Sequence, residues 1–144
     1  LEGMGLAHFS GRKINELSRG EKQLVLIARA LFQSEENLLL DEPTNHLDFR
    51  NTYRVLERLA GLCRHRNTRI IAAVHDPNLV GQYADHVIML KNGEVFVEGA
   101  PQEVMKPASI SELYEMPVTG LEVEGNGWAF KPQIQEENRT WPTF

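Results

Sequence analysis

The sequence predicts an α/β fold in which a buried sheet is followed by antiparallel hairpins. Two apolar runs, at residues 38–40 and 68–74, have the composition of buried strands, and helix-forming segments precede and separate them. Residues 86–99 have the pattern of two strands around Asn92-Gly93, a pair suited to the left-handed conformations of a tight turn. This order of elements indicates half of an α/β domain with a β extension.

The helices are predicted from capping residues and apolar spacing. The segment after Gly20, EKQLVLIARALFQ, is helix-forming and apolar nearly all round, which predicts a buried helix. Asp48 is a suitable N-cap for a helix that includes Cys63, and Asp76-Pro77 caps and starts another. The other expected segments are helical pieces and turns over 1–17, short helices from Pro101 and over 109–116, a hairpin turning at Asn126-Gly127, and a tail after Pro132.

Composition limits the class of protein. The 144 residues, 42% hydrophobic with a net charge of -5, suffice for one domain with a core. No apolar run approaches the roughly 20 residues that span a bilayer, nothing at the start resembles a signal peptide, and a single cysteine excludes an internal disulfide. The acidic balance, without a basic stripe, argues against nonspecific nucleic-acid binding. Because the chain opens at Leu1 within a helical pattern, we expect it to be a piece of a larger protein.

Two adjacent acids follow the first strand, in LLLDEPTNHLD. Successive side chains at a strand end point in different directions, so Asp41 and Glu42 can serve different roles. A strand-end aspartate suits Mg²⁺ beside a nucleotide, and a following glutamate can deprotonate an attacking water. Taken alone, the pair is equally explained as a solvated strand terminus.

Other polar residues likewise have both a functional and a purely structural explanation. In LSRGEKQ, Ser18 and Gly20 would place a hydroxyl and free backbone N–H groups at a helix N-terminus, where the dipole favours phosphate, or would simply cap the helix. His75 directly follows the second strand, where a lone histidine is more often structural than catalytic. Asp48 is sufficiently explained as an N-cap.

As a set, LSRGEKQ, LLLDEPTNHLD and VHDPN resemble the C-terminal half of an ATP-binding-cassette (ABC) ATPase domain, over roughly residues 5 to 120. The fold implied is a partial P-loop NTPase (RecA-like) core that lacks its Walker A half. The resemblance implies a remnant of the helical subdomain with the signature motif and its helix (1–35), the C-terminal part of the ATPase core (36–117), and a C-terminal hairpin and tail (118–144).

The resemblance also implies roles for single residues. Asp41 (Walker B) would hold Mg²⁺, through water, Glu42 would be the catalytic base, and His75 would contact the γ-phosphate of ATP. In this family two domains enclose two ATP molecules head to tail. The signature residues would therefore touch the nucleotide of the other domain, and the D-loop residues would couple the two sites. The signature residues are Ser18, Arg19, Gly20 and Glu21, and those of the D-loop are Asn45 and Asp48.

The chain departs from the family pattern at two places. Arg19 replaces the first glycine of the signature motif and Glu21 its commonest glutamine, and arginine would be strained if its backbone needed a positive φ. No G-x-x-x-x-G-K-[ST] sequence occurs. We therefore expect the 144 residues alone neither to bind ATP tightly nor to hydrolyse it, and to expose the apolar faces of the strands at 38–40 and 69–74.

The segment from His75 to Met105, followed by ISELYEMPV, resembles importers of metal chelates: iron–siderophore, haem and cobalamin. The resemblance implies an ATPase subunit, coupled to transport, at the cytoplasmic face of the membrane. Its partners would be a second ATPase domain and a membrane permease pair, with no nucleic acid. A soluble non-transport ABC ATPase, disfavoured by the residues around His75, and a non-catalytic ABC-like interaction module remain as alternatives.

Overall fold

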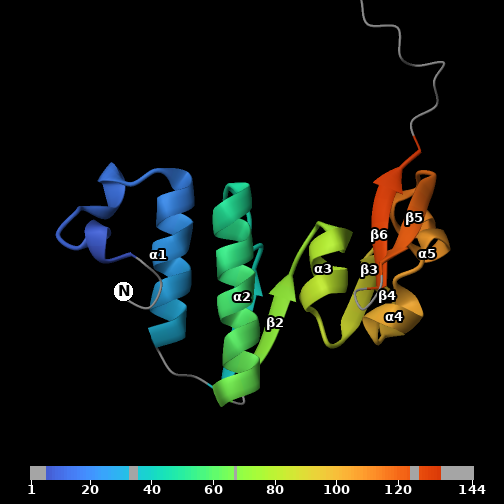
Figure 1. Ribbon diagram of the computed structural model, residues 1–144, viewed down its shortest axis with the longest axis horizontal. Coiled ribbons are helices and arrows are strands. Elements are labelled where there is room, and N and C mark those ends of the chain that lie inside the picture. The colour runs from blue at the N-terminus through green and yellow to red at the C-terminus, as the bar shows by residue number, and fades with distance from the viewer. Residues whose placement is uncertain (1–5, 33–35, 67, 124–126, 134–144) are drawn as a thin grey trace, which may run out of the picture. The chain divides into compact units, whose positions relative to one another are not determined.

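The computed structural model describes residues 6–32, 36–66, 68–123 and 127–133 (Figure 1). The chain folds as two compact units, Leu1–His75 and Asp76–Phe144. No helix within the described residues has the length and apolar character needed to cross a membrane.

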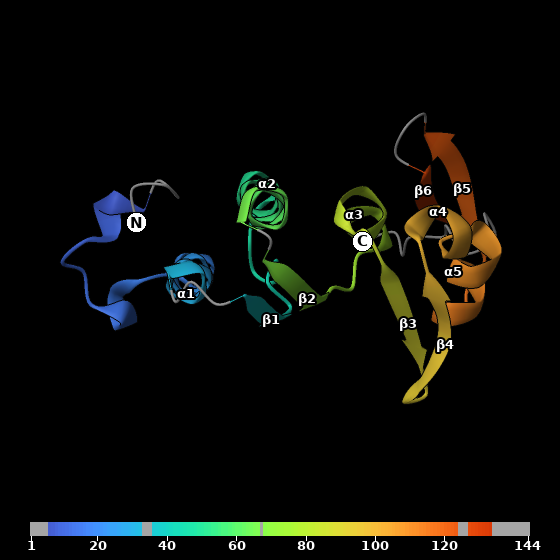
Figure 2. The ribbon, with the colours of Figure 1, turned by 90° about the horizontal axis from the view of Figure 1, so that it is seen from below.

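The N-terminal unit contains a two-stranded parallel sheet and two long helices. In chain order its elements are the 3-10 turns η2 (Ala7–Phe9) and η3 (Ile14–Glu16), helix α1 (Arg19–Phe32), strand β1 (Asn37–Asp41), helix α2 (Phe49–Arg66) and strand β2 (Arg69–Ala73). β1 pairs with β2 in parallel, with Leu38 opposite Ile70 and Asp41 opposite Ala73. Figure 2 shows α2 lying along one face of this pair. The positions of the two predicted strands are confirmed, but the expectation that both are buried is wrong within the described residues: β1 buries only Leu38, and β2 has no buried residue.

Helix α2 begins where the sequence predicts. The Asp48 carboxylate accepts hydrogen bonds from the backbone N–H of Asn51, at 2.7 Å, and from its side-chain amide, at 3.0 Å. The first of these bonds satisfies a backbone donor that the first helical turn leaves unpaired, so Asp48 is confirmed as the N-cap. The helix buries Val55, Leu56 and Leu59, and the predicted helical position of Cys63 is confirmed as well.

Helix α1 differs from its prediction in burial. It buries Leu24, Ile27 and Ala28, whereas Leu26 and Phe32 are exposed. The expectation of a helix buried nearly all round is wrong for the described residues, because these cover only one side of α1.

One face of the parallel sheet is uncovered within the described residues. Leu39 of β1 is 75% exposed and Ile71 of β2 is 68% exposed, while Leu38, on the opposite face, is buried. Leu39 and Ile71 are paired in the register, so they form one apolar strip. The expected exposure of apolar strand faces is confirmed.

The C-terminal unit has its own apolar core. Its elements are α3 (Pro77–Tyr83), β3 (Val87–Lys91), β4 (Glu94–Gly99), α4 (Pro101–Val104), α5 (Pro107–Tyr114), β5 (Val118–Val123) and β6 (Gly127–Pro132). β3 pairs with β4, and β5 with β6, both antiparallel. The core consists of Val87, Met89, Val104, Met105, Ile110 and Phe130. Both predicted hairpins are confirmed.

The turns of the hairpins and the start of α3 follow from local chemistry. Asn92 and Gly93 have φ values of 54° and 82°, the left-handed conformations expected of this pair. Asn126 lies outside the described residues, and Gly127, predicted as a turn residue, instead begins β6 with φ 75° and pairs with Val123. Asp76 caps α3 by accepting a bond from the backbone N–H of Asn78, and Pro77 is the first helical residue, as predicted.

Candidate functional site

The candidate site lies where the two parallel strands of the N-terminal unit end. Because β1 and β2 are parallel, their carboxyl ends share one edge of the sheet, and Asp41 pairs with Ala73 there. The backbone N–H of Glu42 donates to the carbonyl oxygen of Ala73 at 3.1 Å, which extends the pairing beyond β1. Glu42 and His75 thus leave the same sheet edge from adjacent strands.

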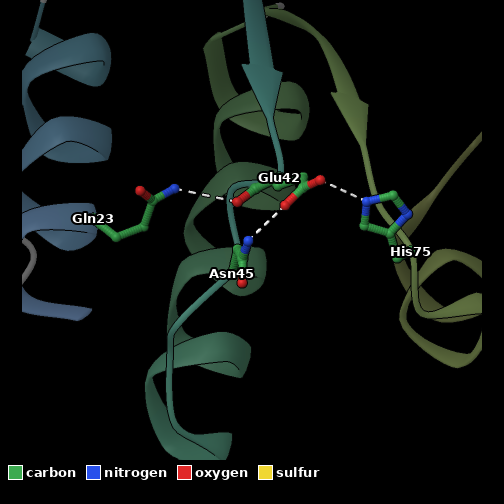
Figure 3. Close-up of polar contacts among 4 residues, drawn as sticks. All are labelled: Gln23, Glu42, Asn45 and His75. Atoms are coloured by element: carbon green, nitrogen blue, oxygen red, sulfur yellow. Dashed lines mark hydrogen bonds and ion pairs between the residues drawn. The ribbon is translucent and has the colours of Figure 1, made fainter. Parts of the chain in front are cut away.

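The two side chains meet directly, as Figure 3 shows. Nε2 of His75 lies 2.6 Å from Oε1 of Glu42, and the side-chain amide of Asn45 donates to Oε2 at 2.6 Å. The Glu42 side chain is 38% exposed and that of His75 is 79% exposed. Glu42 and His75, predicted to act on the nucleotide, and Asn45, predicted in the D-loop, therefore form one contact network that solvent reaches.

The hydrogen bonds of this network determine that Glu42 is ionised and that His75 is the donor. The hydrogen bond from His75, followed by that from Asn45, holds the pKa of the Glu42 carboxyl below its usual value of 4.5. Glu42 is therefore ionised at neutral pH and can only accept hydrogen bonds. It follows that Nε2 of His75 carries the proton of the short contact.

The backbone of Glu42 is unusual. Its φ is +45°, in the left-handed region that residues with a Cβ rarely adopt. Its carbonyl oxygen accepts two hydrogen bonds, from the backbone N–H of Asn45 at 3.0 Å and from the side-chain amide of Gln23 at 3.2 Å (Figure 3). The first bond closes a local turn, and the second comes from helix α1.

Sequence reasoning missed Gln23. It stands in LSRGEKQ, but it is 19 residues from Glu42, and no local pattern signals a contact over that separation. Only the packing of α1 against the turn after β1 shows it.

The signature residues form the N-terminal cap of α1. The Ser18 backbone N–H donates to the Glu21 carboxylate at 2.7 Å, and the Glu21 backbone N–H donates to the Ser18 hydroxyl at 3.3 Å. This reciprocal pair is a capping box. Hydrogen bonding with Ser18, through its backbone first and then its side chain, lowers the pKa of the Glu21 carboxyl. The capping explanation therefore holds for Ser18, with Glu21 as its partner, and the predicted contact of the signature residues with a nucleotide stays a prediction.

Arg19 and Gly20 open helix α1. Arg19 is exposed and is not among the described residues with positive φ, so arginine is not strained there. A Cβ on Gly20 would lie 2.8 Å from the carbonyl oxygen of His46, closer than real Cβ atoms approach. The first turn of α1 therefore lies against the turn after Glu42, and a glycine is required at this contact.

Asp41 and Asp48 lie apart from the Glu42 contacts. Asp48 serves as the cap of α2, and the Asp41 carboxylate is exposed at the sheet edge. Among the described residues, no group of three or more acidic, histidine or cysteine side chains could hold a metal ion by itself. One carboxylate at a strand end nevertheless fits Mg²⁺, which commonly takes one or two carboxylates together with water and substrate phosphate.

Comparison with known proteins gives the same family at the level of sequence. The model of the family described as "ABC transporter" matches residues 1–45. A probable iron chelatin transport ATP-binding protein of Helicobacter pylori is 36% identical over 121 residues, which are 84% of this chain and 48% of that protein. The hemin import ATP-binding protein HmuV of Rhodopseudomonas palustris is 35% identical, covering 96% of this chain and 54% of its own. The chain thus spans about half the length of these curated relatives.

Solved structures agree. A metal-chelate type ABC transporter in an inward-facing conformation matches 94% of this chain and 55% of its own, with a TM-score of 0.81 and 28% identity. In sequence and fold the chain is therefore similar to part of an ABC transporter ATPase domain. The dimeric ATP-binding cassette MJ0796, bound to ADP and Pi, matches 69% of this chain and 44% of its own, with a TM-score of 0.64 and 31% identity.

Proposed function

We propose that this chain is the C-terminal part of the ATPase subunit of an ABC importer, which couples ATP hydrolysis to uptake of a metal chelate such as iron–siderophore, haem or cobalamin. The observation that carries the proposal is the direct contact between Glu42 and His75 at the sheet edge. The similarity to proteins named for iron chelatin and hemin import supports the choice of cargo class.

The geometry suits Glu42 as the general base. A carboxylate offers about four lone-pair positions, and His75 and Asn45 occupy two of them in this structure. Since the side chain is partly exposed, the remaining positions can accept a hydrogen bond from water. Its lowered pKa keeps the carboxylate ionised, and the two donors fix its orientation.

The other predicted residues have supporting roles in the proposal. Asp41 would hold Mg²⁺, which supplies positive charge to neutralise the phosphate oxygens. His75 would orient Glu42 and contact the terminal phosphate. The residues of the α1 cap, Ser18 to Glu21, would face the nucleotide of a second, head-to-tail ATPase domain, and Asn45 and Asp48 would lie at that interface. A permease pair would hold the assembly at the cytoplasmic face of the membrane.

The catalytic part of the proposal is tested by Glu42→Gln in an ATPase that contains these residues together with a phosphate loop. Loss of general-base assistance should lower ATP turnover by about 100- to 10,000-fold while nucleotide affinity is retained. Glu36→Gln, an exposed glutamate before β1, is the matched control and should keep full turnover. Turnover that survives Glu42→Gln would overturn Glu42 as the general base, whereas a parent protein without turnover would favour the non-catalytic interaction module. The 144 residues alone should not hydrolyse ATP.

The transport part needs a separate experiment. The ATPase is reconstituted with its co-purifying permease in vesicles, and uptake of iron–siderophore, haem and cobalamin is measured with and without ATP. Uptake of one chelate that is lost in Glu42→Gln supports the importer. An active ATPase that recruits no membrane partner would instead indicate the soluble, non-transport alternative.

A further inference from the structure

We infer that Gln23 is a positioning residue for Glu42: its side-chain amide holds the backbone of the general base in the conformation that hydrolysis requires. The inference rests on the proposed function. Its direct observation is the bond from Gln23 Nε2 to the Glu42 carbonyl oxygen, 3.2 Å long and partly buried (Figure 3). Gln23 touches the backbone of Glu42 and has no assigned contact with substrate.

The conformation of Glu42 needs external support. A residue with a Cβ at φ +45° stores strain, of order 1–3 kcal/mol in such sparsely populated regions, and persists only when its surroundings over-determine it. Three hydrogen bonds hold the Glu42 backbone: one to Ala73, one from the Asn45 N–H and one from Gln23. Gln23 supplies the only one of these three that comes from neither the sheet nor the local turn.

Helix α1 is itself fixed against this turn, so the amide is presented from a rigid element. The capping box of Ser18 and Glu21 orders the first helical turn. Gly20 allows that turn to approach the His46 carbonyl more closely than any other residue could. These contacts set the position of α1 along the 42–47 segment and place Gln23 opposite the Glu42 carbonyl.

Loss of the amide should act on catalysis rather than on binding. If the Glu42 backbone relaxes toward a more common φ, the carboxylate shifts away from His75 and Asn45. A displacement of about 1 Å at a reacting group can lower a rate by about 100-fold. We therefore expect kcat to fall by about 10- to 100-fold, with KM for ATP unchanged within about twofold.

The variants separate the hydrogen bond from packing. Gln23→Met keeps the length and helix propensity of the side chain but removes the donor, and Gln23→Glu replaces the donor with an acceptor facing a carbonyl oxygen. Both should lower kcat in the complete ATPase, and Gln23→Glu should lower it more. Gln82→Met and Gln82→Glu, on the exposed side of α3, are matched controls and should keep the parent kcat. Thermal unfolding midpoints of all variants are measured in parallel.

A double-variant cycle shows whether Gln23 acts through Glu42. In single-turnover measurements, Gln23→Met should not lower the residual rate of Glu42→Gln any further, because the base it positions is already absent. Parent kcat in Gln23→Met, a loss equal to that of its Gln82 control, or full additivity with Glu42→Gln would each overturn the inference. If Glu42→Gln itself keeps the parent rate, the proposed function fails instead, so the two failures are distinguishable.

Discussion

The two units of this chain differ in the internal contacts that distinguish them. The C-terminal unit encloses an apolar core in which Ile110 is 2% exposed. The N-terminal unit leaves Leu39 and Ile71 of its sheet exposed and gathers its polar contacts at the strand ends, around Glu42. Side chains of similar apolar character therefore contribute very different amounts to stability, depending on whether they lie in a covered core or on the uncovered face of the parallel sheet.

Apolar burial and hydrogen bonding contribute differently to the stability of the fold and to the geometry of the site. Burial of an aliphatic side chain contributes about 1.5–3 kcal/mol, whereas one intramolecular hydrogen bond contributes only about 0.5–1.5 kcal/mol net. The contacts of Glu42 with His75, Asn45 and Gln23 are directional but partly exposed to solvent. They specify where the carboxylate lies far more than they stabilise the fold.

The largest expected effect comes from a matched pair of truncations. Ile110→Ala removes a buried side chain from the C-terminal core and should lower the free energy of unfolding of that unit by about 2–5 kcal/mol. Leu39→Ala removes a similar volume from an exposed strand position and should cost well under about 1 kcal/mol. Urea unfolding followed by hydrogen exchange assigns each loss to its unit. Equal losses of unfolding free energy at the two positions would contradict the prediction that burial sets the cost of each truncation.

The second prediction concerns two glycines in helices of the N-terminal unit. Gly20→Ala puts a methyl group 2.8 Å from the His46 carbonyl, so the turn after Glu42 must shift, at a cost of about 1–3 kcal/mol. Gly61→Ala, in α2, meets nothing within 4 Å and should stabilise by about 0.5–1 kcal/mol through helix propensity. Thermal unfolding compares the two variants. A stabilising Gly20→Ala would mean that α1 does not lie against the 42–47 segment.

The third prediction tests a polar contact in the C-terminal unit. The Asn78 amide accepts from the Phe130 backbone N–H at 2.7 Å and donates to its carbonyl oxygen at 3.3 Å, and so ties α3 to the edge of β6. Asn78→Ala leaves both backbone groups without this partner and should destabilise the unit by about 1–2 kcal/mol. Gln82→Ala, an exposed substitution in the same helix, should be nearly neutral. Trp128, packed on the core, reports unfolding by fluorescence; indistinguishable midpoints would contradict the prediction.

Local patterns predicted the elements and several of their ends. The Asp48 and Asp76 caps and the Asn92-Gly93 turn are short-range features, so the sequence contains all that determines them. The meeting of Glu42 and His75 was predictable because parallel strands end at one sheet edge. The burial of α1 and the contact of Gln23 were not predictable in this way. Both depend on how a helix packs against a segment some 20 residues away, which no periodicity encodes.

The smallest expected effect is a shift in the titration of Glu42. Its pKa in the folded chain lies below the unfolded value of 4.5, first because of the bond with His75 and then because of that with Asn45. The associated stabilisation of the N-terminal unit is therefore complete above pH 4.5 and is lost as the pH falls through the folded pKa. The carboxyl carbon of Glu42, followed by NMR, should titrate with a midpoint below 4.5.

Removal of each donor should show how much of the lowering of the Glu42 pKa is due to His75 and how much to Asn45. His75→Ala should raise the Glu42 midpoint toward 4.5, and Asn45→Ala should raise it less, because the histidine bond has the larger influence on this carboxylate. Asn51→Ala, whose side chain bonds to Asp48 instead, is the control and should leave the midpoint in place. A midpoint at 4.5 in the parent chain, or one that His75→Ala does not move, would mean that Glu42 and His75 do not share a hydrogen bond in solution. The contacts of Glu42 would then define the position of its carboxylate less well than the C-terminal core defines the positions of its side chains, and they would also contribute less to stability.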